Sequence, residues 1–190
     1  MIDLSETVRE REAARWCLFI DRDGVINTRI VDGYVRSWAE FEFVPGVLGA
    51  LRALARWAPR IVVVTNQQGV GKALMTRSEL DEIHERMRRE VEAAGGRIDA
   101  VRACTHLATA DCDCRKPMAG LATGYLDAHP DIDGSLSIMV GDMPSDIEMG
   151  HRLAAVTGGC LTVRIGAEHD PAADATFASL ADFVCALGES

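Results

Sequence analysis

Short apolar runs rich in β-branched residues alternate along the chain with longer segments in which apolar residues recur every three or four positions. The short runs are typical of strands buried on both faces, and the longer segments are typical of amphipathic helices. The expected strands are residues 16–20, 61–64, 100–103, 136–140 and 161–165. The expected helices are residues 46–57, a long helix opened by a capping box at residues 76–79, residues 145–156 and residues 179–187. This alternation predicts an α/β fold with a central parallel sheet.

Polar residues follow three of these strands at the point where each strand ends. The first strand runs into Asp21-Arg22-Asp23-Gly24, the second into Thr65-Asn66-Gln67, and the fourth into Gly141-Asp142. Arg115-Lys116-Pro117 lies between the last two. Asp and Gly are common turn residues, so the first segment alone would also fit an ordinary turn. Because parallel strands deliver their carboxyl ends to one edge of the sheet, we expect the four segments to converge there.

The side chains in these segments suggest one kind of chemistry. Two neighbouring carboxylates repel unless a proton or a cation lies between them, and Mg²⁺ is the usual cation for an oxygen cluster. A carboxylate can also attack phosphorus and form an aspartyl-phosphate. A nucleophile, a hydroxyl and amide pair, a cationic pair and a metal-binding acid at one edge therefore indicate phosphoryl transfer.

A second cluster consists of Cys104-Thr105-His106 and Cys112-Asp113-Cys114, which are five residues apart. Three thiols and an imidazole on one loop fit a tetrahedral, structural zinc site with Cys104, His106, Cys112 and Cys114 as its ligands. The alternative is a loop of reduced thiols beside an incidental histidine. Because Cys114 directly precedes Arg115, a metal here would stiffen the loop that presents both cations. The other cysteines, Cys17, Cys160 and Cys185, are expected to be core residues. The helical His84 is expected to lie on the helix surface or to pack against its neighbours, without a ligand role.

Composition narrows the possible partners. The 190 residues suffice for one domain, expected over residues 1–190 with residues 1–14 as an N-terminal extension. The net charge of −9 argues against a nucleic acid or an anionic membrane as partner, so a small phosphorylated metabolite would rely on local cations. The charged N-terminus resembles neither a signal peptide nor an anchor, and no apolar run approaches the roughly 20 residues that span a bilayer. We therefore expect a cytoplasmic protein that acts as a monomer.

The four segments at the strand ends resemble, in order, the motifs of the haloacid-dehalogenase (HAD) superfamily of phosphohydrolases. The resemblance covers residues 17–146, and it implies a Rossmannoid three-layer sandwich with a central parallel sheet. The chain has no room for the large cap domain that many members carry. Its longest insertion candidates are residues 28–43 and 104–114, which we expect to set the specificity of an open site.

The zinc loop resembles one HAD branch, which contains the D-glycero-D-manno-heptose 1,7-bisphosphate 7-phosphatases and the histidinol-phosphate phosphatases. The segment from Asp21 to Asn27 and the tripeptide Gly33-Tyr34-Val35 look like the heptose enzymes. The five-residue gap between His106 and Cys112 looks like the histidinol-phosphate enzymes instead. Heptose-bisphosphate phosphatases commonly carry Lys where this chain has Met143, which removes a possible phosphate contact.

The resemblance implies a role for each matching residue. Asp21 is the nucleophile, Asp23 is the acid/base, and Thr65 and Lys116 stabilise the phosphoryl oxygens. Mg²⁺ is held by Asp21, the backbone carbonyl of Asp23 and Asp142, while Asp146 orients the site. The implied substrate contacts are Asn27, Gly33, Tyr34, Asn66, Gln67 and Arg115.

Three other classes share parts of this pattern. A phosphoryl-receiver module also combines an acidic cluster with a Thr and a Lys, but it does not need the acid/base Asp23 or the cations of Arg115-Lys116. A catalytically inactive, zinc-stabilised interaction domain is disfavoured, because every catalytic position is filled. A phosphotransferase would use the same residues with an alcohol as acceptor in place of water.

Overall fold

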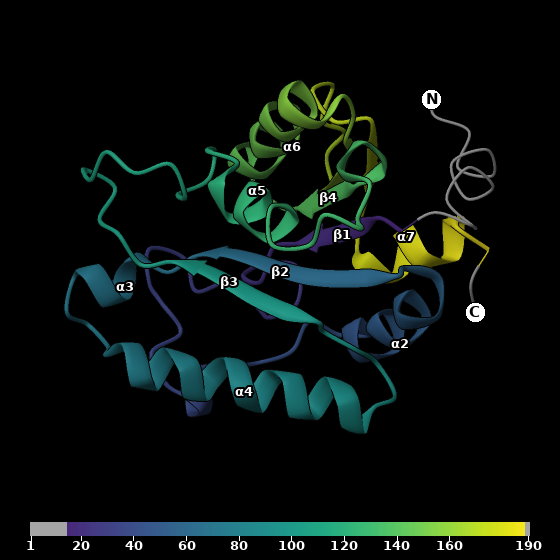
Figure 1. Ribbon diagram of the computed structural model, residues 1–190. Helices are drawn as coiled ribbons and strands as arrows, with labels where there is room; N and C mark the ends of the chain where they lie inside the picture. The colour runs from purple at the N-terminus through teal and green to yellow at the C-terminus, as the bar shows by residue number, and fades with distance from the viewer. Residues whose placement is uncertain (1–14, 189–190) are drawn as a thin grey trace.

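The computed structural model describes residues 15–188, so the N-terminal extension expected over residues 1–14 lies outside the described residues, as do residues 189–190. Six parallel strands form one sheet in the order β3-β2-β1-β4-β5-β6, with β1 in its middle (Figure 1). The strands are β1 (Cys17–Ile20), β2 (Arg60–Asn66), β3 (Ala100–Cys104), β4 (Ile138–Gly141), β5 (Leu161–Ile165) and β6 (Ala175–Phe177). The predicted parallel α/β fold is confirmed.

Helices cover both faces of the sheet, because successive side chains of a buried strand point to opposite sides. Leu18 and Ile20 of β1 pack in one apolar cluster with α2 (Val47–Trp57), α4 (Arg77–Ala93) and α7 (Leu180–Ala186). Phe19 packs in the other with α5 (Gly120–Leu126) and α6 (Pro144–Thr157). Figure 1 shows these as the layers below and above the sheet, which completes a three-layer sandwich.

The capping box that opens α4 forms as the sequence predicts. The backbone N–H of Glu79 donates to Thr76 Oγ1 at 3.2 Å, and Glu79 Oε2 accepts the N–H of Thr76 at 2.6 Å. Leu80, Ile83 and Met87 are buried on the face of α4 that meets the sheet. α4 therefore begins at Arg77, directly after the predicted cap.

Several predicted element boundaries differ from the structure by one or two residues, and two of these differences have a local cause. The strand expected over residues 136–140 begins at Ile138, because residues Gly134–Leu136 form a 3₁₀ turn (η2) whose Ser135 N–H donates to Asp133 Oδ1 at 3.0 Å. The helix expected from Ser145 begins one residue earlier at Pro144, whose missing N–H suits the first helical position.

The expected burial of Cys185 is also wrong, since that thiol lies on the exposed side of α7. Cys17 is buried as expected, and Cys160 is partly buried.

The connections place few elements over the carboxyl ends of the strands. Between β1 and α2 the chain forms one short 3₁₀ helix, η1 (Trp38–Glu40), and β2 leads into the single turn α3 (Gln68–Gly71). Within residues 15–188 no separate layer covers this edge. None of the helices in that range combines the length and the apolar character needed to cross a bilayer.

Candidate active site

The first two carboxylates of the site follow adjacent strands. Asp21 comes directly after β1, and its backbone N–H donates to the carbonyl of Val140 in β4 at 2.9 Å. Asp142 comes directly after β4, and oxygens of Asp21, Asp142 and Asp146 lie within 4.8 Å of one another. The turn of Gly24, with a φ of +93°, packs so close to this cluster that a Cβ there would lie 2.0 Å from Asp142 Oδ2. Only glycine fits this position.

Lys116 binds the acidic cluster from the side of the zinc loop. Its buried Nζ lies 2.6 Å from Asp21 Oδ1 and 2.7 Å from Asp146 Oδ1, and it donates to the carbonyl of Val64 at 3.0 Å. The other oxygen of Asp146 accepts the backbone N–H of Met143 at 2.9 Å. Asp146 thus uses one oxygen to hold Lys116 and the other to cap α6.

Burial raises the pKa of Asp21 to about 7, and the Lys116 ammonium opposes that shift. Burial would lower the pKa of Lys116, but the charges of Asp146 and Asp21 outweigh it and raise that pKa. Burial likewise raises the pKa of Asp142 to about 6, against the opposing charge of Arg29. A dication at this cluster would favour the ionised carboxylates, because an opposite charge nearby lowers an acid's pKa.

Asp23 occupies a different environment, in which hydrogen-bond donors surround the carboxylate. Its Oδ1 accepts from Arg22 Nη2 at 2.9 Å and from Asn27 Nδ2 at 3.0 Å, and its Oδ2 accepts from Gln67 Nε2 at 2.7 Å. Burial raises the pKa of Asp23, but the Arg22 charge and these three donors outweigh it and lower the pKa. Gln67 Nε2 also donates to Thr65 Oγ1 at 2.8 Å, so Thr65 belongs to the same hydrogen-bonded group.

Asn27 is fully buried behind Asp23, where its amide also donates to the carbonyl of Thr28 at 2.9 Å. Asn27 therefore contacts the acid/base candidate Asp23 and does not line the cavity. The sequence could not distinguish such a supporting position from the implied substrate contact.

Arg22 is a part of the site that the sequence analysis did not single out. Its side chain is fully buried, and its Nη1 lies 3.0 Å from His84 Nε2 on α4. Burial and the Arg22 charge lower the pKa of His84 to about 3, so a neutral imidazole faces the guanidinium. Of the two alternatives for His84, the structure shows the packed one, in which the imidazole supports Arg22.

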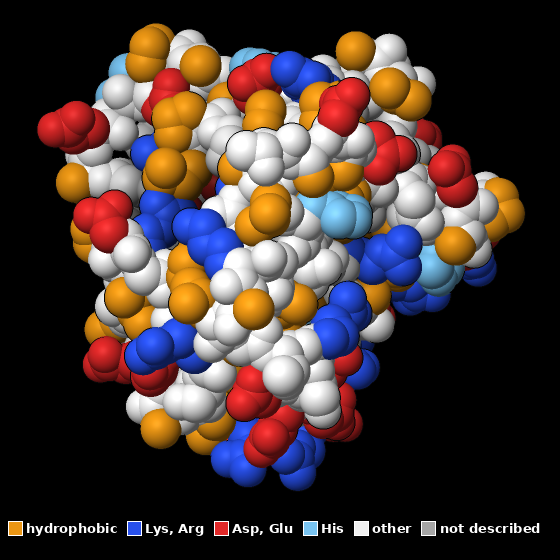
Figure 2. Space-filling model, turned by 90° about the vertical axis from the view of Figure 1, so that its left-hand side faces the viewer, with side chains coloured by type: hydrophobic (Ala, Val, Ile, Leu, Met, Phe, Trp, Pro, Cys, Tyr) orange, Lys and Arg blue, Asp and Glu red, His pale blue; other side chains and the backbone are white. Residues whose placement is uncertain are grey.

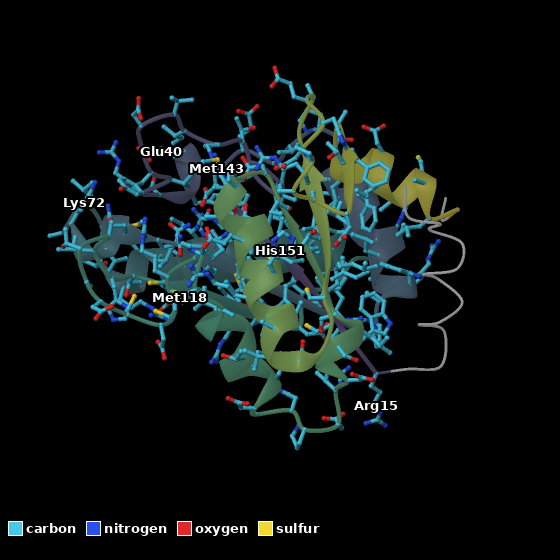
Figure 3. The ribbon with its side chains drawn as sticks, turned by 90° about the horizontal axis from the view of Figure 1, so that it is seen from above. Arg15, Glu40, Lys72, Met118, Met143 and His151 are labelled. Atoms are coloured by element: carbon cyan, nitrogen blue, oxygen red, sulfur yellow. The ribbon has the colours of Figure 1, made fainter. Side chains whose placement is uncertain are left out.

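A cavity of about 470 Å³ opens beside these carboxylates at the edge where the strands end. Its wall includes the following residues predicted for the site: Asp21, Asp23, Gly33, Tyr34, Thr65, Asn66, Gln67, Arg115 and Lys116. Figure 2 shows this face of the molecule, with Lys and Arg side chains spread around its middle. Met143 also lines the cavity, and Figure 3 places it at the same end of the molecule as Lys72, opposite Arg15.

Two residues of the cavity wall are tied to the loop that carries the cysteines, Asn66 directly and Tyr34 through Gln68. Asn66 donates from Nδ2 to the carbonyl of Lys116 at 3.0 Å, and its Oδ1 accepts the N–H of Lys116 at 3.0 Å. Gln68 donates to the hydroxyl of Tyr34 at 3.2 Å and accepts the N–H of Ala108. Lys72 Nζ lies 5.3 Å from the centre of the Tyr34 ring, within cation–π range.

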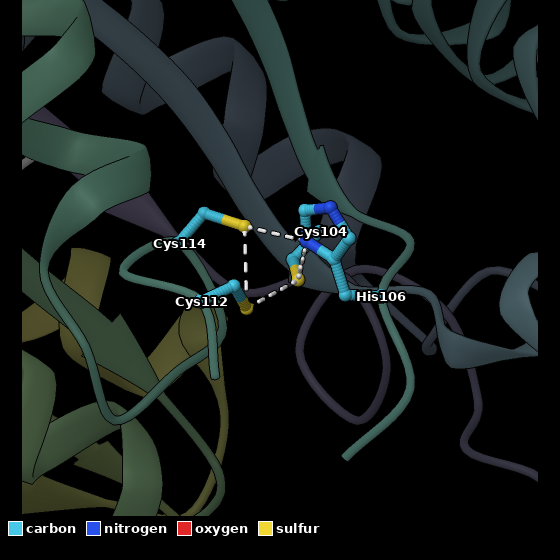
Figure 4. Close-up of side chains that lie close together, drawn as sticks. All are labelled: Cys104, His106, Cys112 and Cys114. Atoms are coloured by element: carbon cyan, nitrogen blue, oxygen red, sulfur yellow. Dashed lines mark hydrogen bonds between the residues drawn. The ribbon is translucent and has the colours of Figure 1, made fainter. Parts of the chain in front are cut away.

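The four predicted zinc ligands lie together, with Cys104 at the end of β3 and the other three on the loop that follows it (Figure 4). The Cys112 sulfur is 3.9 Å from Cys104 Sγ and 3.7 Å from Cys114 Sγ. His106 Nδ1 is 3.6 Å from Cys104 Sγ and 3.2 Å from Cys114 Sγ. Zinc bonds of about 2.3 Å to sulfur and 2.0–2.1 Å to nitrogen would separate tetrahedral ligands by about 3.5–3.8 Å. The donor set and its spacing therefore fit a zinc ion, and the sulfurs are too far apart for disulfides.

Arg29 is the other contact that sequence reasoning missed. Its Nη2 lies 2.8 Å from Asp142 Oδ1 and donates to the backbone carbonyl of Asp23 at 3.2 Å. Asp142 is 113 positions away along the chain, so no local pattern could have indicated the pair.

The site therefore combines three acidic groups at the carboxyl edge of a parallel sheet: Asp21 beside Lys116, the hydrogen-bonded Asp23, and Asp142. This arrangement is that of a phosphohydrolase of the HAD superfamily. The family described as polynucleotide kinase 3 phosphatase matches residues 19–184, and the chain belongs to it, within the HAD branch of the heptose-bisphosphate and histidinol-phosphate phosphatases.

The curated relatives that match the chain extend over nearly its whole length. It is 47% identical over 184 residues to the D-glycero-alpha-D-manno-heptose-1,7-bisphosphate 7-phosphatase of Mycobacterium tuberculosis, covering 96% of this chain and 97% of that one. It is 34% identical over 181 residues to the D-glycero-beta-D-manno-heptose-1,7-bisphosphate 7-phosphatase of Escherichia coli K12, covering 90% and 92%.

A solved structure shares the fold. The D,D-heptose 1,7-bisphosphate phosphatase from B. bronchiseptica, in complex with magnesium and phosphate, is 28% identical with a TM-score of 0.79. It covers 90% of this chain and 97% of its own. The chain is therefore a phosphatase, as the motifs predict.

Proposed function

We propose that the chain removes the 7-phosphate of D-glycero-D-manno-heptose 1,7-bisphosphate through a phospho-aspartate at Asp21. The observation that carries the reaction is the contact of Asp21 with the buried Lys116 at 2.6 Å, on the wall of a cavity that also contains Asp23. The substrate follows from the names of the relatives. Their names also disfavour histidinol phosphate, which the short zinc loop had suggested.

Asp21 attacks phosphorus, so that an oxygen–phosphorus bond forms at its carboxylate while the bond to the sugar oxygen breaks. Asp23 gives a proton to the leaving alkoxide, then takes a proton from the water that cleaves the phospho-aspartate. In the free protein the donors around Asp23 keep it ionised, which is the state that the second step needs. An incoming phosphate raises the pKa of Asp23 by like-charge repulsion, so that Asp23 takes up a proton from solvent as the substrate binds and holds it for the first step.

The cations of the site hold the phosphoryl group. Lys116 faces the oxygens of the transferred phosphate, with Thr65 beside it. Arg115, whose Nη1 has no hydrogen-bond partner among the described residues, is placed on the wall to grip the second phosphate. Tyr34 and Gly33 border the sugar, and Asn66 fixes the backbone of Lys116. These groups match a small substrate with a phosphate at each end.

Two metals fit the donor sets. Asp21, the carbonyl of Asp23 and Asp142 would hold Mg²⁺, which shields the repulsion between the nucleophile and the phosphate. Cys104, His106, Cys112 and Cys114 would hold a structural Zn²⁺. The neighbour solved with magnesium and phosphate supports the first assignment. The spacing of the sulfur and nitrogen atoms supports the second.

We further propose a preference for the α anomer. The relative named for the α anomer is 47% identical to this chain, whereas the relative named for the β anomer is 34% identical. That the enzyme is a single-domain, cytoplasmic monomer that binds neither nucleic acid nor membranes stays a prediction from composition.

The test compares kcat/KM for phosphate release from both heptose 1,7-bisphosphate anomers and from histidinol phosphate, with Mg²⁺ present. We expect a preference for the α anomer over histidinol phosphate of at least about 100-fold, or about 3 kcal/mol in transition-state binding. Asp21→Asn should abolish turnover, whereas Asp127→Asn, on an exposed position at the end of α5, should not change it. Equal turnover of the Asp21→Asn variant, or a preference for histidinol phosphate, would contradict the proposal.

A further inference from the structure

Arg29 forms its ion pair with Asp142 at the position assigned to the metal. A single nitrogen, Nη2, is 2.8 Å from Asp142 Oδ1 and 3.2 Å from the carbonyl oxygen of Asp23. These oxygens belong to two of the three groups that the proposed function gives to Mg²⁺. The side chain of Asp142 is only 16% exposed and that of Arg29 is 32% exposed, so the pair is largely withdrawn from solvent.

The surroundings explain why a positive group is held there. Four carboxylates meet at this edge of the sheet, from Asp21, Asp23, Asp142 and Asp146, while Lys116 and Arg22 are the buried cations that face them. Lys116 pairs with Asp21 and Asp146, and Arg22 pairs with Asp23. Arg29 pairs with the remaining carboxylate, Asp142.

A guanidinium and a magnesium ion compete for these two oxygens. Mg²⁺ binds oxygen at about 2.0–2.1 Å, so a guanidinium nitrogen bonded to the same two oxygens would lie only a few ångströms from the dication, where the two positive charges repel strongly. The guanidinium also keeps its charge at any pH at which the protein is folded, so it cannot leave by losing a proton. Its displacement therefore requires a move of the side chain.

We propose that Arg29 is an internal occupant of the metal position, which Mg²⁺ must displace before the site can act. The inference rests on the proposed function, because that function assigns Asp142 and the Asp23 carbonyl to the metal. Arg29 lines the same cavity as Tyr34 and Arg115, so the displaced guanidinium stays beside the space for the anionic substrate. Binding of Mg²⁺ therefore also changes where the positive charge of Arg29 lies relative to the substrate.

The expected size of the effect follows from the occupancy. If the guanidinium holds Asp142 in about nine tenths of the metal-free molecules, the apparent Kd for Mg²⁺ is about tenfold weaker than the intrinsic one. Arg29→Met removes the occupant and should lower the measured Kd by about that factor. Arg115→Met is the matched control, because it removes an equal charge from the same cavity wall without an ion pair to Asp142.

The experiment titrates Mg²⁺ into the zinc-loaded, substrate-free protein by calorimetry, for the wild type and both variants. A Kd about tenfold lower in Arg29→Met, with less than about a threefold change in Arg115→Met, supports displacement. Equal affinities, or an equal gain in both variants, would overturn it, the latter because charge alone would then suffice. A crystal structure with Mg²⁺ in which Arg29 still contacts Asp142 would also overturn it.

The failure of this inference is separable from a failure of the proposed function. Wild-type protein that releases phosphate with Mg²⁺ while Arg29→Met binds the ion no more tightly retains the function and loses only the displacement. Wild-type protein that neither binds Mg²⁺ nor releases phosphate contradicts both.

Discussion

Replacing Lys116 by methionine removes the ammonium that Asp21 and Asp146 share. The exposed fractions of the three side chains are 3%, 7% and 0%, so water cannot take over the lost contacts. Removing one partner of a buried ion pair costs about 3–5 kcal/mol, because the remaining charge is left uncompensated. At about 2–4 °C per kcal/mol for a chain of this size, the thermal midpoint should fall by roughly 6–20 °C.

The assay is urea unfolding followed by tryptophan fluorescence in magnesium-free buffer, since the buried Trp16 reports on the core. Lys72→Met is the matched control, because Lys72 is the other lysine of the chain and lies exposed on the surface. Its cost should stay within about 1 kcal/mol, the range of an exposed cation–π contact. A Lys116→Met variant as stable as the wild type would refute the assignment of this buried ion pair.

A second substitution separates the charge effect from lost packing. Asp146→Asn in the Lys116→Met background removes one of the two uncompensated carboxylates, while its amide oxygen can still accept the N–H of Met143. The double variant should therefore regain part of the lost free energy of unfolding, by about 1–2 kcal/mol. It should remain inactive, since Asp21 still lacks its cation. Additive losses in the double variant would show that packing, not charge, sets the cost.

Three other predictions concern the zinc cluster, the Gly24 turn and the buried imidazole. Purified protein should contain about one zinc per chain by elemental analysis, and Cys104→Ser should lose the metal and lower the thermal midpoint, while Cys185→Ser retains both. Gly24→Ala should destabilise the protein by at least about 1–2 kcal/mol and weaken Mg²⁺ binding, because the added Cβ would clash with Asp142 in a backbone of φ +93°. An unchanged affinity for Mg²⁺ in calorimetry would contradict this packing. His84 has a folded pKa of about 3 against about 6.5 when unfolded, so the unfolded chain binds the extra proton between these values and stability rises with pH through that window. His84→Gln should therefore shrink the difference in unfolding free energy between pH 8 and pH 5 by about 2 kcal/mol, and an unchanged difference would show that the fold does not lower the pKa of His84.

The parts of the fold that the sequence predicted are those with a strong local pattern. The continuous apolar runs of β1 and β2 and the capping box of α4 state their structure within a few residues. α5 escaped prediction because its seven residues include two glycines and it forms mainly by packing Leu121, Ala122 and Tyr125 against the sheet. β6 has three half-buried residues, which are too few to show a period.

The candidate site divides in the same way. The carboxylates, Lys116 and the cysteine cluster were predicted because each lies in a short motif at a strand end or on one loop. The contacts of Arg29 with Asp142 and of Arg22 with His84 were not, because 113 and 62 positions separate the partners. Such pairs depend on how the strands and helices assemble, which no local pattern records.

The two hydrogen bonds between Asn66 and the backbone of Lys116 have a consequence for how this loop can vary. They fix the peptide groups of Lys116 to the end of β2 in the manner of a strand pair, independently of the thiolates upstream. The segment between His106 and Cys112 is therefore held at both ends by members of the cysteine and histidine cluster, and it includes neither Arg115 nor Lys116. Insertions or deletions there would reach the cavity through Gln68, which joins Ala108 to Tyr34 of the cavity wall, while Lys116 keeps its register against Asp21. Changes of this segment would therefore alter the substrate range without loss of the reaction.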